Sequence, residues 1–327
     1  MTGQRVAFSY HISHEQFAPS ELLRLVRHAE AVGFDAAFSS DHLQPWSASQ
    51  GHSGFTWSWL GAALQATTRL TFSAITVPCG WRYQPVVLAQ ALATLAELFP
   101  GRVPWIALGS GEAINERAIG TPWPDRAERH ARLQEGARIM RALLAGEIVT
   151  HSGFVNACNA RVWSLPATPP RLVGAAVTAS TAEWLGGWAD GLLTVGRDVA
   201  ALERIVQAFR HGGGANKPVY LKLNLSWARS AEQALAQAHE QWRFNVLGGD
   251  VNWELSTPAQ FESAARFVRP EDMHADVFID SDPQRHAEFI RECARLGFHS
   301  IDLHNVGRNQ HEFLTVFGKE VLPALRR

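Results

Sequence analysis

Hydrophobic residues along the chain follow two alternating patterns. Short, nearly continuous apolar runs are each followed by a longer segment in which apolar residues recur every three or four positions. The first pattern is typical of strands buried on both faces, and the second of helices that pack one face against a sheet. The runs predict eight strands, at residues 6–10, 34–40, 69–77, 103–110, 170–177, 191–195, 218–227 and 300–306.

The segments between these runs predict helices. The first is expected to begin at Pro19 and Ser20 and to end at Gly33, because its apolar residues share one face at Leu22, Leu23, Val26 and Ala29. Further helices are expected within 54–66, over 85–98, around 126–145, near 180–188, over 198–210 and near 309–325. Eight strand and helix pairs predict an α/β fold, a (β/α)8 TIM barrel that forms a single domain over residues 1–327.

Two stretches exceed the strand and helix alternation and are expected to be insertions. They cover residues near 146–169 and near 241–276. In the second, Gly248-Gly249 predicts a turn, and Ser256 or Thr257 is the expected N-cap of a helix. Long insertions on a barrel commonly build the mouth of a site or a subunit contact.

Composition narrows the classes of function. The chain has 327 residues, 46% of them hydrophobic, with a formal net charge of −1. No apolar run reaches the roughly 18 residues that a membrane span needs, and a near-neutral charge gives no general attraction to nucleic acid or to anionic lipid. We therefore expect a small-molecule ligand. The flat faces of the twelve tryptophans suit the binding of a ring, although tryptophans as often fill protein cores.

The expected location is the cytoplasm. The first residues, MTGQRVAFSY, lack a basic segment followed by an apolar stretch and a cleavage site, so no secretory signal is expected. The three cysteines, Cys79, Cys158 and Cys293, are widely spaced and form no C-x-x-C pair, which indicates separate reduced thiols rather than disulfides or a zinc site.

Polar residues follow several of the predicted strands, and the carboxyl ends of barrel strands are where active sites form. Because all these ends meet at one rim, the side chains are expected to converge despite their distance in sequence. They are Asp41 and His42 after the second strand, Thr76 at the third, Ser110 and Glu112 after the fourth and Arg197 after the sixth.

His42 is the candidate for proton transfer, because imidazole titrates near neutral pH and the adjacent acid or a backbone carbonyl can fix its tautomer. Trp46, held by Pro45, is a candidate platform over a ligand ring. The alternatives are a histidine that only caps a strand end by hydrogen bonds and a tryptophan that fills the core, and the residues alone do not decide between them.

Two short motifs are weak indications of ligand binding. In ALGSGEAINE (107–116), Gly109 and Gly111 permit close backbone approach at a strand-to-helix turn, but the lysine of a Walker loop and the third glycine of a dinucleotide fingerprint are missing. Glu112 in this motif can stay protonated in a dry cavity. VTASTAEW (177–184) opens a helix with hydroxyls that suit either an anion site or simple N-capping.

A metal site is not expected. The chain has fourteen histidines, and HISH (11–14) follows the first strand. Neither this motif nor a later set of histidines and acids has the spacing of a zinc site. A metal-dependent barrel hydrolase and a non-catalytic flavin-binding protein remain alternatives from other classes.

Five segments together resemble the luciferase-like family of flavin- and deazaflavin-dependent oxidoreductases, in particular the coenzyme F420-dependent glucose-6-phosphate dehydrogenases. They are HEQFAPSELL, SSDHLQPW, HSGFTWSWLGA, RYQPVVLAQALATLAELFPGRV and GSGEAINE. The resemblance implies that His42 takes the hydroxyl proton as hydride leaves the alcohol carbon, that Glu112 protonates the deazaflavin ring, and that Trp46 lines the reacting centre.

The resemblance also implies a cofactor site. It predicts a cis peptide bond between Ala74 and Ile75, a homodimer, and cofactor contacts from Asp41, Ala74, Ile75, Thr76, Gly109, Ser110, Gly111, Asn115, Ala175 and Ala176. Thr178, Ser180 and Thr181, at the expected helix start, are the candidates for holding a cofactor phosphate.

The chain differs from the glucose-6-phosphate dehydrogenases that it resembles at positions that affect the expected substrate and cofactor. Where that branch holds a sugar phosphate with two lysines and an arginine, this chain has Arg197, Asn252 and Asp276. One cation remains, so efficient oxidation of glucose 6-phosphate is not expected, and Arg197 and Asn252 are the candidate substrate residues. Val177-Thr178 replaces a pair of glycines, which slightly favours FMN over coenzyme F420 as the cofactor. With FMN, a monooxygenase that uses O₂ is the alternative enzyme.

Overall fold

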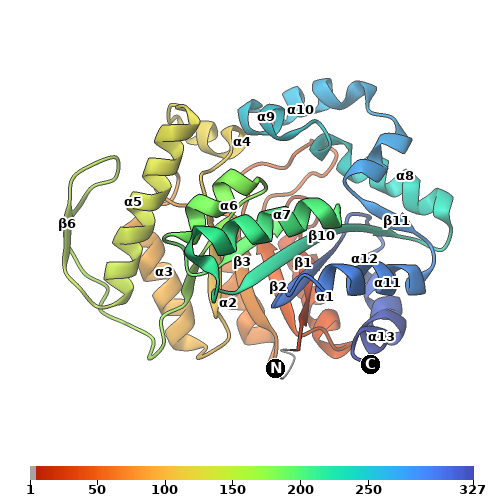
Figure 1. Ribbon diagram of the computed structural model, residues 1–327, viewed down its shortest axis with the longest axis horizontal. Coiled ribbons are helices and arrows are strands. Elements are labelled where there is room, and N and C mark those ends of the chain that lie inside the picture. Colours follow the sequence, from red (N-terminus) through yellow and green to blue (C-terminus); the bar gives the residue numbers. More distant parts are fainter. Residues whose placement is uncertain (1–4) are drawn as a thin grey trace.

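Ten strands form one sheet that nearly closes on itself (Figure 1). The computed structural model describes residues 5–327. The strands are β1 (Ala7–Ile12), β2 (Ala36–Ser40), β3 (Thr71–Ile75), β4 (Val77–Pro78), β5 (Trp105–Gly109), β8 (Arg171–Ala175), β9 (Leu192–Val195), β10 (Val219–Trp227), β11 (Phe278–Asp280) and β12 (Ser300–Asn305).

The hydrogen-bonded order of the sheet is β3-β2-β1-β12-β10-β9-β8-β5-β4, with β11 added beside β10, and every pair in it is parallel. β4 follows β3 after one residue, so the two ends of this path belong to adjacent segments of chain. The sheet is therefore a barrel, and the predicted (β/α)8 fold is confirmed. The eight predicted strands correspond to β1, β2, β3 with β4, β5, β8, β9, β10 and β12.

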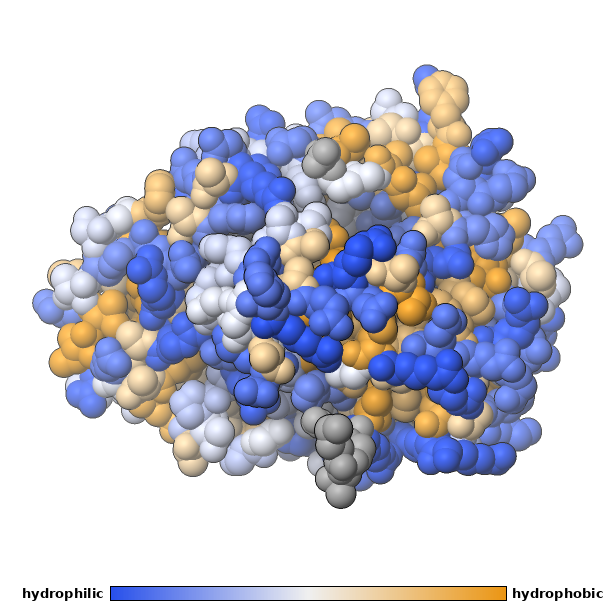
Figure 2. Space-filling model, in the orientation of Figure 1, coloured by the Kyte–Doolittle hydropathy of each residue, from blue (hydrophilic) through white to orange (hydrophobic). Residues whose placement is uncertain are grey.

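Helices surround the barrel, and each presents an apolar face to it. α1 begins at the predicted proline and buries Leu22, Leu25, Val26 and Ala29. The surrounding helices are α1 (Pro19–Ala31), α2 (Thr56–Ala66), α3 (Pro85–Leu98), α5 (Arg126–Leu144), α6 (Ala179–Gly186), α7 (Val199–Phe209), α8 (Ala231–Trp242), α11 (Pro283–Ala294), α12 (Gln310–Val316) and α13 (Leu322–Leu325). In Figure 2, hydrophilic side chains cover most of the face in view. None of the helices described is long and apolar enough to cross a membrane.

The inside of the barrel is packed with aromatic and branched side chains. The Trp105 and Tyr220 rings stack with centroids 4.1 Å apart, and Phe38 meets Trp105 edge-on at 4.8 Å. Val173 and Leu193 complete the same cluster. This layer fixes the strands against one another, so the residues at their carboxyl ends have a rigid support.

The two stretches expected to be insertions contain elements outside the strands of the barrel. Residues 146–169 contain an antiparallel pair, β6 (Val149–His151) and β7 (Ala157–Ala160), at the left edge of Figure 1. The second insertion begins at Arg243, directly after α8, and contains α9 (Gly249–Glu254) and α10 (Pro258–Ala264). The side chain of Thr257, one of the two expected caps, accepts a hydrogen bond from the backbone N–H of Gln260 at the start of α10.

The position predicted for a cis peptide bond, between Ala74 and Ile75, is wrong. The cis bond joins Ile75 to Thr76. The reason is visible in the strand pairing: β3 stays in register with β2 as far as Ile75, which lies opposite Ser40, so the preceding bond belongs to regular strand. The chain leaves the strand only after Ile75.

Candidate active site

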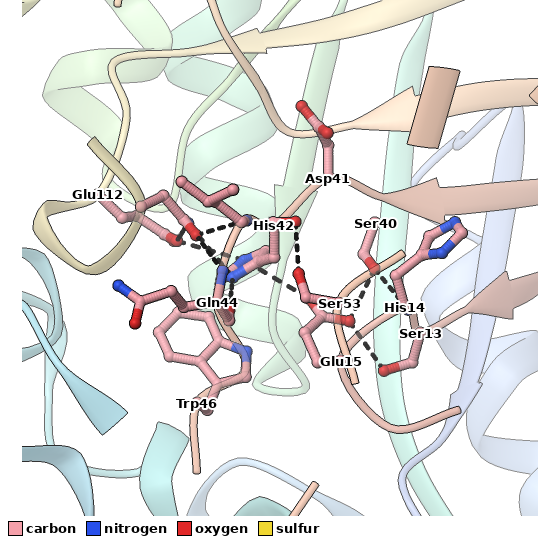
Figure 3. Close-up of polar contacts among 12 residues, drawn as sticks. Ser13, His14, Glu15, Ser40, Asp41, His42, Gln44, Trp46, Ser53 and Glu112 are labelled. Atoms are coloured by element: carbon pink, nitrogen blue, oxygen red, sulfur yellow. Dashed lines mark hydrogen bonds and ion pairs between the residues drawn. The ribbon is translucent and has the colours of Figure 1, made fainter. Parts of the chain in front are cut away.

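His42 lies between two carboxyl groups just beyond the end of β2. Its Nε2 atom is 3.3 Å from Oε2 of Glu112 and 3.6 Å from Oε1 of Glu15. Figure 3 shows the imidazole between these two acids, with the Asp41 side chain pointing away from it. The exposed fractions of the three side chains are 11% for His42, 22% for Glu112 and 5% for Glu15. The structure thus brings together the predicted base and the predicted acid.

Glu15, which was not predicted from the sequence, is the second acid at His42. Its Oε2 atom accepts hydrogen bonds from the hydroxyls of Ser13 at 3.0 Å and Ser40 at 2.7 Å. Burial raises the pKa of Glu15, but His42 and the hydrogen bonds from the Glu15 backbone N–H and the Ser40 hydroxyl outweigh that effect, so its pKa is lowered overall. Glu15 is therefore a carboxylate that stabilises positive charge on the imidazole.

Asn115 fixes the other side of the His42 ring. Its Oδ1 atom accepts from the backbone N–H groups of Leu43 at 2.9 Å and Gln44 at 3.2 Å. Its Nδ2 atom lies 3.2 Å from Nδ1 of His42 and 3.1 Å from Oε2 of Glu112. Nδ1 also lies 3.3 Å from the carbonyl oxygen of Gln44, so each neutral tautomer of His42 finds a partner there. Such a ring can carry its proton on either nitrogen.

Glu112 opens the short helix α4 (Ala113–Glu116), directly after β5. Burial raises the pKa of its carboxyl, and the negative charge of Glu15 adds to the rise, whereas His42 and Arg82 oppose it. Of the two acids at His42, Glu112 therefore holds a proton to higher pH than Glu15. Two carboxyl groups with pKa values moved in opposite directions are typical of acid–base catalysis.

Trp46 packs against His42, as expected for an aromatic at the reacting centre. Their ring centroids are 4.7 Å apart and the rings are tilted by 54°. Behind it, the Phe261 ring from α10 meets the indole edge-on at 5.2 Å. The second insertion thus holds Trp46 in place.

A network around Arg82, also not predicted from the sequence, ties the loops after β2 and β5 together. The guanidinium lies 3.0 Å from Oδ2 of Asp41 and 2.5 Å from Oε1 of Glu116. The Tyr83 hydroxyl donates to Oδ1 of Asp41 at 2.8 Å. Asp41 is thus occupied by Arg82 and Tyr83, and the tautomer of His42 depends on Asn115 and Gln44 instead.

The larger of two cavities at this rim has a volume of about 690 Å³, within the range of cofactor sites. It runs from His42 and Glu112 to the N-terminal ends of α5 and α6. Of the predicted cofactor residues, it is lined by Asp41, Thr76, Gly109, Ser110, Gly111, Asn115, Ala175, Ala176, Thr178 and Thr181. Ala74 and Ser180 do not line it, and Ile75 lines the neighbouring cavity instead.

Gly109 allows close packing at the floor of the larger cavity. A Cβ atom at this position would lie 2.2 Å from Cγ2 of Thr76, a distance too short for two carbon atoms that are not bonded to each other. Trp123, which also lines the cavity, has a buried indole N–H with no hydrogen-bond partner among the described residues. An unpaired buried donor in a cavity wall is a feature that a bound polar group would satisfy.

The smaller cavity, of about 450 Å³, shares His42, Glu112 and Thr76 with the larger one. Trp46, Glu15 and the predicted substrate residue Asn252 line it. Arg197, the other predicted substrate residue, does not, because its guanidinium donates to the backbone carbonyls of His274 and Val277. Lys222 and Asp276 also line it, and Lys222 was not predicted from the sequence.

Within residues 5–327, no group of three or more histidine, cysteine, aspartate or glutamate side chains is arranged to hold a metal ion. In HISH, His14 instead bonds the Ser39 hydroxyl at 3.0 Å, and His11 bonds Asp302 at 2.7 Å.

Comparisons with known proteins show the family of the chain. Residues 5–300 match the model of the luciferase-like monooxygenase family. The chain is 34% identical to the F420-dependent glucose-6-phosphate dehydrogenase of Nakamurella multipartita, over 100% of this chain and 98% of that relative. It is 35% identical to the enzyme of that name from Beutenbergia cavernae, over 97% of this chain and 96% of that one.

Among solved structures, an F420-dependent secondary alcohol dehydrogenase in complex with an F420-acetone adduct matches with a TM-score of 0.92. Its sequence is 26% identical, and the match covers 99% of this chain and 100% of that one. These matches show an oxidoreductase. The chain belongs to the luciferase-like monooxygenase family.

Proposed function

We propose that this protein is a coenzyme F420-dependent alcohol dehydrogenase. The observation that carries the proposal is the position of His42: its Nε2 atom faces Glu15 and Glu112 at the junction of the two cavities. One cavity then holds the redox ring and the other the alcohol. The names of the similar proteins, glucose-6-phosphate dehydrogenase and secondary alcohol dehydrogenase, support this division.

The larger cavity fits a deazaflavin cofactor. Its volume, its glycine-lined floor and the unpaired N–H of Trp123 suit a flat ring with polar groups. Thr76, Gly109 and Gly111 would hold the ring end, and Thr178 with Thr181, at the start of α6, would hold the phosphate. When bound, a deazaflavin ring supplies a two-electron hydride acceptor.

The protein's own residues manage the protons. His42 receives the hydroxyl proton of the alcohol at Nε2, and a carbonyl forms as hydride leaves the same carbon. Glu15, kept ionised, stabilises the imidazolium that results. Glu112, whose raised pKa lets it keep a proton, faces the larger cavity and supplies that proton there.

FMN is the alternative cofactor. The departure at Val177-Thr178 favours it slightly, but the similar proteins named above use F420, so the comparisons do not support that preference. The description of the family model favours a second candidate function, a monooxygenase that uses reduced FMN and O₂. Oxygen consumption in the presence of reduced FMN and an organic substrate distinguishes it from a dehydrogenase.

We further propose that glucose 6-phosphate is a poor substrate. A phosphate dianion needs charge-assisted hydrogen bonds from lysine or arginine. Arg197 is bound to backbone carbonyls outside both cavities, and Asn252 and Asp276 occupy the positions where the resemblance implies cations. Rapid turnover of this sugar phosphate would contradict the proposal.

The decisive experiment is a titration of the purified protein with coenzyme F420 and with FMN, followed by quenching of tryptophan fluorescence. We expect tighter binding of F420, and loss of its visible absorbance when a secondary alcohol is added. Binding of neither cofactor would overturn the proposal, and tight binding of FMN alone with oxygen uptake would establish the second candidate. The expected homodimer and the cytoplasmic location stay predictions, the first of which sedimentation tests.

A further inference from the structure

The far wall of the smaller cavity carries polar groups that the proposed chemistry does not use. Asp276 is the central one. Its Oδ2 atom accepts a hydrogen bond from Nδ2 of Asn224 at 3.1 Å, and no hydrogen bond to its Oδ1 atom is found among the described residues. Because Asp276 lines the cavity, this oxygen is available as an acceptor for a ligand. Burial raises the pKa of the Asp276 carboxyl, whereas Lys222 and the Asn224 amide oppose the rise and favour the carboxylate.

Asn224 and Lys222 fix Asp276 from behind. Nζ of Lys222 donates to Oδ1 of Asn224 at 3.0 Å, which leaves the amide of Asn224 to donate to Asp276. Lys222 is opposite Asp302 in the register of β10 and β12. Burial lowers the pKa of its ammonium group, and the charges of Asp302 and Asp276 oppose that effect and favour the charged form.

The charges of the smaller cavity do not suit an anion. Besides Glu112, which keeps its proton, its lining includes two carboxyl side chains, Glu15 and Asp276, against one ammonium group, that of Lys222. A phosphate or carboxylate on the substrate would meet net negative charge and no uncompensated cation. The cavity therefore selects against anionic substrates even where their size fits.

The remaining lining suits a ring that carries hydroxyls. Three indoles, those of Trp46, Trp242 and Trp253, contribute flat apolar faces, while Asn252 and Asn245 add amides. Oδ1 of Asn252 and Nδ2 of Asn245 are buried without hydrogen-bond partners in the described part of the chain. Aromatic faces pack on the C–H faces of sugar rings, and amides and carboxylates bond to hydroxyls.

We propose that the smaller cavity binds a neutral cyclic polyol, such as an unphosphorylated sugar, with Asp276 accepting a hydrogen bond from one of its hydroxyls. This inference rests on the proposed function, because it assigns the substrate class of the same alcohol dehydrogenase. Oxidation takes place at a hydroxyl held by His42, and Asp276 binds a second hydroxyl on the opposite side of the ring.

The first test measures binding without any cofactor. D-glucose, glucose 6-phosphate and cyclohexanol are titrated separately into the protein while tryptophan fluorescence is followed, since three indoles line the cavity. We expect saturable quenching by glucose, at least tenfold weaker binding of the phosphate, and at least tenfold weaker binding of glucose to Asp276→Asn. The matched control, Glu271→Gln, changes an exposed acid of the same segment and should bind glucose like the wild type.

The second test measures turnover with F420. The ratio of kcat/KM for glucose to that for cyclohexanol should fall about tenfold in Asp276→Asn and stay unchanged in Glu271→Gln. Tighter binding or faster turnover of glucose 6-phosphate than of glucose, or an equal loss for both alcohols in Asp276→Asn, would overturn the inference. If no alcohol reduces F420, the proposed function fails, and the cofactor-free titration still decides the substrate class.

Discussion

Nε2 of His42 lies 3.3 Å from Oε2 of Glu112, although the two residues are seventy positions apart and follow different strands. β2 delivers the histidine and β5 the acid to the same rim, where the Asn115 amide contacts both. The pair forms the boundary between the two cavities. A proton carrier and an acid in this position can act on a substrate and on a cofactor at the same time.

Replacement of His42 by alanine should abolish most of the activity and leave cofactor binding nearly intact. Loss of a general base typically lowers kcat by about 10²- to 10⁴-fold, whereas the cofactor contacts proposed above come mainly from other residues. Single-turnover reduction of F420 measures the first quantity and fluorescence titration the second. His211→Ala, an exposed histidine that is 82% accessible, is the control and should behave as the wild type. Unchanged kcat in His42→Ala would remove this histidine from the mechanism.

Replacement of Glu15 by glutamine should slow alcohol oxidation. The carboxylate of Glu15 stabilises the imidazolium, and a neutral amide cannot do so. We expect kcat to fall, with KM little changed, because the imidazolium formed in the reaction loses its neighbouring carboxylate. An unchanged kcat would show that Glu15 only packs against the ring.

The rate should fall as the pH rises through the raised pKa of Glu112. Burial and Glu15 favour its protonated form, and a proton donor loses its function once it is ionised. The Glu112→Gln variant should have a low kcat at all pH values, and its kcat should not decrease further as the pH rises. The measurement is kcat for alcohol oxidation across the pH range, in wild type and variant. Persistence of the same decrease in Glu112→Gln would assign it to another group.

Gly109→Ala should destabilise the protein and weaken cofactor binding, because its Cβ would lie 2.2 Å from Cγ2 of Thr76. Overpacking of this kind typically costs about 1–3 kcal/mol. The double variant Gly109→Ala with Thr76→Ser removes the clashing methyl group and should recover most of the loss. Urea denaturation measures the stability. If the double variant is as unstable as the single one, the clash is not the cause.

Stability should decrease as the pH falls from about 6.5 towards 4, partly through His286. Burial lowers the pKa of this histidine to about 4, so between these values the unfolded chain binds a proton that the folded chain does not. By that linkage His286→Gln should lose about 2 kcal/mol less stability between pH 7 and pH 5 than the wild type. Urea unfolding at both pH values measures this, and equal losses would contradict it.

The sequence predicted the barrel, and it predicted His42, Glu112 and Trp46 because they directly follow strands or belong to motifs of fixed order. Glu15 follows β1 in the same way, but its neighbours in HISH directed attention to metal binding. Its position after β1 is nevertheless the same kind of strand-end position as that of His42 after β2.

Other parts of the site depend on contacts that no local pattern reveals. Lys222 reads as an interruption of an apolar strand, and only the register of β10 and β12 shows that it lies opposite Asp302. Arg82 lies in a loop, and its link between Asp41 and Glu116 exists only in three dimensions. Arg197 shows the converse: it follows a strand, yet nearby backbone carbonyls hold its side chain outside both cavities.

The insertion between α8 and β11 supplies Asn245, Asn252 and Asp276, whereas the proton-transferring residues belong to the loops after β1, β2 and β5. Under the proposed substrate assignment, one contiguous stretch of about thirty codons would encode most of the selectivity. Recombination or insertion within that stretch would let a lineage acquire new alcohols while the acid–base machinery is inherited unaltered.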